Sequence, residues 1–197
     1  TRRSTPSSGS KRVGKRLLPA LLWVLPLLFF STPSELLLLA SAVLLHEGGH
    51  LLGFFLTKEP CPTLSAVAAG LLLDPARPIS YKKEIVILLL GPLANLLLSL
   101  PLLFLSHGEW ALMTATVHLF SALCNLFPLR QNDGGRALFD VLSLLLPPDT
   151  AERLCSLISL LSFFALVFVF LFFLLSPGGG GVILLLVALL SRASPRL

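Results

Sequence analysis

The segment Leu37–Leu56 reads LLLASAVLLHEGGHLLGFFL, an apolar run that contains two histidines and one glutamate. A helix that crosses the hydrocarbon core of a bilayer needs about 20 residues, and this segment is long enough. Each ionisable side chain placed in such a helix costs about 2.5 kcal/mol or more, so it needs a functional reason. The segment therefore predicts a membrane-spanning helix that carries a functional site.

The composition of the whole chain agrees with a membrane protein. Of its 197 residues, 55% are hydrophobic and only 13% are charged, whereas soluble domains are about 25% charged. This excludes a soluble globular domain, a disordered or fibrous chain and a nucleic-acid-binding protein. The three cysteines are too few, and odd in number, for a disulfide framework.

Apolar runs predict about six membrane spans in an all-α protein. The last run is roughly 14 Å long as a helix, which leaves open whether it crosses the membrane. The spans are Leu17–Ser31, Leu37–Leu56, Ile85–Leu105, Trp110–Leu129, Leu154–Leu175 and Val182–Leu190.

The basic residues indicate the orientation of these spans. All 15 lysines and arginines lie in segments that alternate spans place on one side, and the connections 31–36, 106–109 and 176–181 hold none. The positive-inside rule therefore puts both termini and the 57–83 loop in the cytoplasm. We interpret the basic tail 1–16, expected to be disordered, as a topology signal; an anionic-lipid site is the lesser alternative.

The 57–83 loop has weak strand character. Alternation over Thr63–Ala66, then Gly70, then three leucines predicts a strand, a turn and a second strand. An ordinary connecting loop is the alternative.

The histidines of the second span are spaced to share a metal ion. His46 and His50 lie at i and i+4, on one face of a helix. Glu47 is turned by about 100° from His46, which suits it to contact a metal-bound water rather than the metal. His-Glu-x-x-His is a metallopeptidase pattern, in which zinc activates water and the glutamate takes its proton. The alternatives are a chance match or buried histidines that are only hydrogen-bonded.

A catalytic zinc site needs a third protein ligand. Leu56 stands where one soluble class has its third histidine, which excludes that class. Glu59 and Asp74 lie in the following loop. Farther on, Asp133 precedes two glycines and can turn back towards the bilayer, and the predicted topology puts both His50 and Asp133 near the cytoplasmic face.

Three motifs in this order resemble the site-2 protease family of intramembrane zinc metalloproteases. They are His46-Glu47-Gly48-Gly49-His50, Gly91-Pro92-Leu93-Ala94-Asn95 and Asn125…Pro128…Asp133-Gly134. The resemblance covers roughly residues 37–142. It implies about six transmembrane helices around a three-helix core, with a short β-like loop after the first motif.

The resemblance also implies the roles of individual residues. His46, His50 and Asp133 would bind one Zn²⁺ ion, and Glu47 would be the general base. Asn95 and Asn125 would support the substrate or the transition state beside the scissile bond. Without the resemblance, hydrogen bonds between helices would explain both asparagines, and His118 is interpreted as a satisfied core histidine.

The layout of spans looks most like stage IV sporulation protein FB and its clostridial relatives. This implies a multi-pass protein of the bacterial cell membrane with its active site near the cytoplasmic face. Its partners would be the bilayer and a transmembrane or membrane-associated protein substrate, such as a sporulation sigma factor precursor. Regulatory membrane partners are compatible with this. One protease domain is expected over 17–191, with tails at 1–16 and 192–197 and without a PDZ or nucleotide-binding regulatory domain.

Two features depart from the family pattern. Asn132 stands where leucine is frequent, and Arg130-Gln131 replaces an apolar or proline-rich stretch. Both differences lie next to Asp133, so they bear on how the Asp133 loop packs.

Two other functions remain open at this point. One is a metal-binding membrane protein or transporter without peptidase activity, since buried His, Glu and Asp also mark ion pathways. The position of Glu47 separates it from a protease, because a transporter has no need of a base next to a ligand. The other is a degenerate protease acting as a chaperone, against which the intact motif residues argue.

Overall fold

The computed structural model describes residues 32–60, 62–67, 70–75 and 77–175. The predicted first and last spans, Leu17–Ser31 and Val182–Leu190, and both predicted tails lie outside these residues. The elements are α2 (Pro33–Leu56), β1 (Thr63–Val67), β2 (Gly70–Asp74), α3 (Tyr81–Leu105), α4 (Glu109–Leu126), α5 (Asp133–Leu145) and α6 (Pro148–Leu175).

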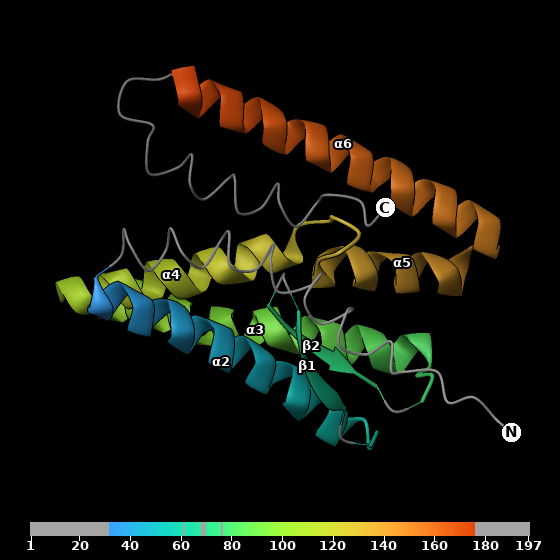
Figure 1. Ribbon diagram of the computed structural model, residues 1–197, viewed down its shortest axis with the longest axis horizontal. Coiled ribbons are helices and arrows are strands. Elements are labelled where there is room, and N and C mark those ends of the chain that lie inside the picture. The colour runs from blue at the N-terminus through green and yellow to red at the C-terminus, as the bar shows by residue number, and fades with distance from the viewer. Residues whose placement is uncertain (1–31, 61, 68–69, 76, 176–197) are drawn as a thin grey trace, which may run out of the picture.

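Helix α3 is the centre of the packing. It contacts α2, α4 and α5, and α5 in turn contacts α6. In the view of Figure 1, α5 lies above the right-hand part of α3, and α6 lies above α5. The residues of the first and second motifs therefore lie on neighbouring helices.

Three of the described helices are long and apolar enough to cross a membrane: α2, α3 and the Pro148–Val169 part of α6. They contain the predicted second and third spans and most of the fifth. Helix α4, which covers most of the predicted fourth span, is not among them. It ends at Leu126 because Phe127 is extended and Pro128 follows. The described residues thus support a helical membrane fold, and six crossings are not shown.

A capping box fixes the beginning of α2. The Thr32 hydroxyl accepts a hydrogen bond from the Glu35 amide at 3.3 Å, and the Glu35 carboxylate accepts one from the Thr32 amide at 2.7 Å. Pro33 occupies the first turn, where its missing N–H costs nothing. Helix α2 therefore begins four residues before the predicted span and runs unbroken through both histidines.

The strands β1 and β2 form an antiparallel pair in the stretch where strand, turn and strand were predicted. Thr63 is paired with Asp74, and Val67 with Gly70. Glu59 precedes β1, and Arg77 and Lys83 follow β2. The Glu59 carboxylate accepts hydrogen bonds from Lys83 at 2.6 Å and from Arg77 at 2.9 Å. These two cations hold the pKa of Glu59 below its usual value. The ion pairs join the two ends of the loop.

Helix α5 was not predicted. The glycines after Asp133 indicated a turn, but Asp133 is the first residue of a helix that contains them both. A Cβ at Gly134 would collide with the Leu126 carbonyl, and one at Gly135 with the Leu129 carbonyl. Glycine costs helix propensity, but here it lets the first turn of α5 rest directly on the last residue of α4 and on the backbone just after it.

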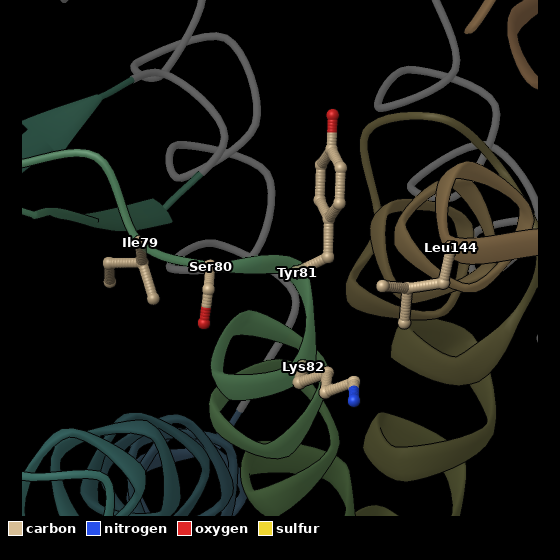
Figure 2. A pocket seen from close by; sticks show the side chains of 5 residues that line it. All are labelled: Ile79, Ser80, Tyr81, Lys82 and Leu144. Atoms are coloured by element: carbon tan, nitrogen blue, oxygen red, sulfur yellow. The ribbon is translucent and has the colours of Figure 1, made fainter. Parts of the chain in front are cut away.

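A cavity of about 300 Å³ lies where α3 begins, beside the end of α5. Figure 2 shows the side chains that line it: Ile79, Ser80, Tyr81, Lys82 and Leu144. None of the predicted site residues is among them.

Candidate metal centre

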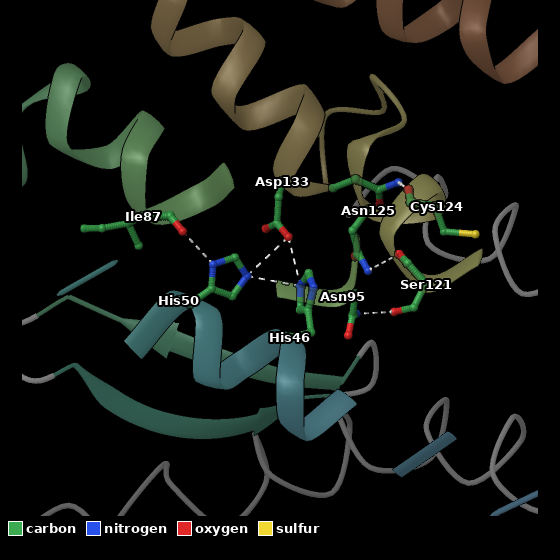
Figure 3. Close-up of polar contacts among 9 residues, drawn as sticks. His46, His50, Ile87, Asn95, Ser121, Cys124, Asn125 and Asp133 are labelled. Carbon is green, nitrogen blue, oxygen red and sulfur yellow. Dashed lines mark hydrogen bonds and ion pairs between the residues drawn. The ribbon is translucent and has the colours of Figure 1, made fainter. Parts of the chain in front are cut away.

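His46, His50 and Asp133 meet at one point (Figure 3). The Oδ2 atom of Asp133 lies 3.0 Å from His46 Nε2 and 3.2 Å from His50 Nε2. The two Nε2 atoms lie 3.1 Å apart. Two ligand atoms come from successive turns of α2 and the third from the first residue of α5, so the fold joins segments far apart in the sequence.

These separations fit a bound cation. Ligand atoms about 2.0–2.1 Å from a tetrahedral zinc ion would lie about 3.3 Å from one another. The three observed separations are close to this value. Two imidazoles and a carboxylate are also a ligand set that zinc accepts, and a fourth position would remain for water. His46 and His50 are each only 7% exposed, so the group could hold a metal ion away from bulk solvent.

Helix α3 orients one of the two imidazoles. His50 Nδ1 lies 2.8 Å from the carbonyl oxygen of Ile87, so Nδ1 carries the hydrogen and donates it. This leaves the lone pair of His50 Nε2 facing the other ligand atoms, as a metal site requires. His46 Nδ1 is buried and has no hydrogen-bond partner among the residues that the structure describes.

Two glycines let α3 pack closely against α2 and its two imidazoles. A Cβ at Gly91 would lie 2.5 Å from the His50 ring and 3.0 Å from the His46 ring. A Cβ at Gly49 would lie 2.8 Å from Gly91 Cα. Small residues at a helix contact allow the two backbones to approach each other. Gly49 and Gly91 therefore make room for the imidazoles between α2 and α3.

Glu47 is half-buried and lies outside the group of three ligand atoms. This agrees with its angular offset from His46 on α2. The metal-ligand group of the described residues therefore consists of His46, His50 and Asp133 without Glu47.

The asparagines of the second and third motifs share a contact on α4. Asn95 Nδ2 donates to Ser121 Oγ at 3.1 Å, and Asn125 Nδ2 donates to the Ser121 carbonyl at 2.8 Å. Asn95 is 0% exposed, whereas Asn125 is half-buried. The structure thus brings both side chains to one residue, although only Asn125 has surface to offer a ligand directly.

His118 lies outside the group of metal-ligand atoms. It is 1% exposed and hydrogen-bonded, as expected of a satisfied core histidine. Its contact with Asn95 was not predicted, because no sequence spacing relates residues on two different helices.

The departures from the family motif tie the Asp133 loop to its neighbours. Asn132 is 3% exposed and donates through Nδ2 to the Cys124 carbonyl at 2.7 Å. Arg130 pairs with Glu152 and donates to Ser156 Oγ at 3.1 Å. Polar contacts to α4 and α6 therefore hold the segment that precedes Asp133.

Comparison with solved structures shows what the fold of this chain is similar to. The chain is similar to the Site-2 Protease from Methanocaldococcus jannaschii, with a TM-score of 0.62 and 20% sequence identity over 90% of this chain and 85% of that one. No protein-family model and no curated protein matches the chain. At this identity the likeness shows a shared fold.

Proposed function

We propose that this protein is an intramembrane zinc metalloendopeptidase of the site-2 protease type. The observation that carries the proposal is the convergence of His46, His50 and Asp133 within 3.2 Å, with Glu47 next to His46 on the same helix. The shared fold and the apolar helices α2 and α3 support a site at membrane depth.

Each residue of the site would have its own role in hydrolysis. His46, His50 and Asp133 would hold Zn²⁺, which supplies activation of water and polarisation of the scissile carbonyl. Glu47 would accept the proton of the attacking water and pass it to the leaving amine. Asn125, with Asn95 behind it, would support the substrate or the transition state.

The proposed substrate is a transmembrane or membrane-associated protein. Its scissile segment must be extended, and an extended segment can add to an edge of the β1–β2 pair through main-chain hydrogen bonds. We place the protein in a bacterial cell membrane with its site near the cytoplasmic face. The layout of the spans, with the β-like loop after the first motif, supports a substrate such as a sporulation sigma factor precursor.

Glu47→Gln tests the mechanism. The variant keeps the size of the side chain but removes its basicity, and general base catalysis contributes about 10²–10⁴-fold. Purified wild type should cleave candidate single-span substrates, and a chelator should abolish this. Glu47→Gln should lose at least about 100-fold in rate, keep its zinc by elemental analysis and co-purify with uncleaved substrate.

Asp133→Ala is the matched comparison, because it should lose zinc occupancy as well as activity. Cleavage at the wild-type rate by Glu47→Gln would show that the mechanism is wrong. If wild type cleaves nothing and metal flux into vesicles depends on Glu47, the protein is a metal transporter instead.

A further inference from the structure

Three polar side chains join α2, α3 and α4; His118 and Asn95 are buried, and Ser41 is exposed. His118, on α4, places Nδ1 2.9 Å from Asn95 Oδ1 on α3. Its other ring nitrogen, Nε2, lies 3.2 Å from Ser41 Oγ on α2. One imidazole thus contacts a polar group on each of the two helices that meet at the candidate metal centre.

The direction of the hydrogen bond between His118 and Asn95 follows from the other contact of the Asn95 amide. Its Nδ2 donates to Ser121 Oγ, so its Oδ1 is turned towards His118 and accepts. His118 Nδ1 must therefore carry a hydrogen. An apolar side chain of similar size at position 118 could not make this bond, and it would leave the fully buried Oδ1 of Asn95 without its donor.

Asn95 lies on the turn of α3 next to the metal centre. Ile87, Gly91 and Asn95 are spaced by four residues, so they share one face of the helix. The Ile87 carbonyl accepts from His50, and Gly91 faces both imidazole rings so closely that a Cβ there would crowd them. Helix α3 is continuous through these positions, although Pro92 removes one of its backbone hydrogen bonds, so a displacement of α3 at Asn95 moves Gly91, in the adjacent turn, and Ile87 beyond it.

We propose that His118 is a positioning residue for the metal centre. His118 contacts Asn95 on α3 and Ser41 on α2, and so it fixes these two helices relative to each other. Helix α3 then holds the His50 imidazole with Nε2 towards His46 and Asp133. The consequence for cleavage rests on the proposed function, whereas the consequence for metal binding needs only the three ligand residues.

Cobalt binding tests the proposal without substrate. The full chain in detergent is freed of metal with a chelator and titrated with Co²⁺, whose visible absorption reports both affinity and ligand geometry. Replacing residues behind metal ligands costs about 10–100-fold in affinity, and we expect His118→Leu to lose about tenfold with a changed spectrum. His118→Asn, whose amide can place an N–H near the position of Nδ1, should recover most of the loss.

Two further variants show whether His118 acts through Asn95. Asn95→Leu should weaken Co²⁺ binding as much as His118→Leu does, and the double variant should be no worse than either, because both remove one interaction. Thr116→Val is the control. It removes another side-chain hydrogen bond of α4, from Thr116 Oγ1 to the Leu112 carbonyl at 2.8 Å, but on an exposed residue, so affinity should not change.

In the cleavage assay, His118→Leu should lower kcat and leave KM near the wild-type value. Wild-type Co²⁺ affinity and spectrum in His118→Leu would overturn the proposal, as would losses that multiply in the double variant.

If His118→Leu does not fold, His118→Asn is compared with His118→Gln, whose amide reaches towards Ser41 instead. Equal binding by these two variants would also overturn it. Absence of cleavage by wild type contradicts the proposed function and leaves the cobalt result valid.

Discussion

Gly91 and Gly48 belong to motifs of the same site but differ in what surrounds them. A methyl group at Gly91 would lie 2.5 Å from the His50 ring, whereas one at Gly48 would meet nothing within 4 Å. The close contact at Gly91 involves ring atoms held between two helices, which cannot shift without moving a ligand nitrogen.

Gly91→Ala should therefore impair the metal centre. We expect metal affinity to fall at least about tenfold, the lower end for disturbed ligand support, and cleavage to fall with it. Gly48→Ala is the matched control and should bind metal like wild type, with slightly higher stability because alanine favours a helix by about 1 kcal/mol. Equal metal binding by the two variants would show that the helix contact at Gly91 does not hold the imidazoles. Co²⁺ titration measures both.

At the level of single residues, the sequence was most informative where spacing is local. The i, i+4 relation of His46 and His50 and the offset of Glu47 follow from helix geometry alone. The approach of Asp133 was inferred from topology and resemblance, and its distances depend on tertiary packing. The burial of Asn95 and its bond to His118 could not be predicted, because they depend on how α3 and α4 are rotated against each other.

Helix α5, which carries Asp133, has two further charged residues that affect its stability in opposite ways. Arg136 pairs with Glu84 of α3 at 2.9 Å. Asp140, one turn farther along α5, is only 4% exposed, and its Oδ2 has no hydrogen-bond partner among the described residues. Burial, together with the nearby Glu84 carboxylate, raises the pKa of Asp140 to about 7, although Arg136 opposes the shift.

This shift predicts how stability depends on pH. An unfolded aspartate titrates near pH 3.9, so between about pH 4 and 7 the folded state binds more protons than the unfolded state. Asp140 therefore makes the protein less stable as pH rises through this range, and the loss is complete above the folded pKa. Asp140→Asn mimics the neutral form and should melt at a higher temperature than wild type at pH 8.

Thermal unfolding in detergent at pH 5.5 and pH 8 measures the melting temperatures of Asp140→Asn and wild type. The difference between the two melting temperatures should be larger at pH 8 than at pH 5.5. The same gap at both values would mean that Asp140 does not titrate in this range.

The sequence predicted the long apolar helices better than the short ones. Helices α2 and α3 are long enough for composition to indicate them. Helix α5 has only 13 residues, and its first residue is followed by two glycines, which in isolation favour a turn. It forms because those glycines fit against the carbonyls of Leu126 and Leu129. This is a tertiary contact, which the helix propensities of the residues do not predict.

The orientation of the whole molecule can be tested at two exposed positions. Lys58 follows the end of α2, and Glu109 begins α4, just after α3. If α2 and α3 both cross the membrane, these positions lie on opposite sides. In a Cys61→Ser background, an impermeant thiol reagent applied to intact cells should label Glu109→Cys and not Lys58→Cys. Cys124 and Cys155 are buried and should contribute little background.

Opening the cells should make Lys58→Cys reactive, which controls for a cysteine that is merely hidden. Labelling of Lys58→Cys from outside would reverse the orientation and put the candidate metal centre near the other face of the membrane.

The ligands of the candidate centre come from two helices that are made at different times. During synthesis α2 leaves the ribosome first, and it brings two histidines and the glutamate without the aspartate. The set becomes complete only when α5 has been made and has settled against α3. A growing chain would therefore pass through the insertion machinery before its candidate metal centre is complete, and any chemistry of that centre would begin only after α5 has folded.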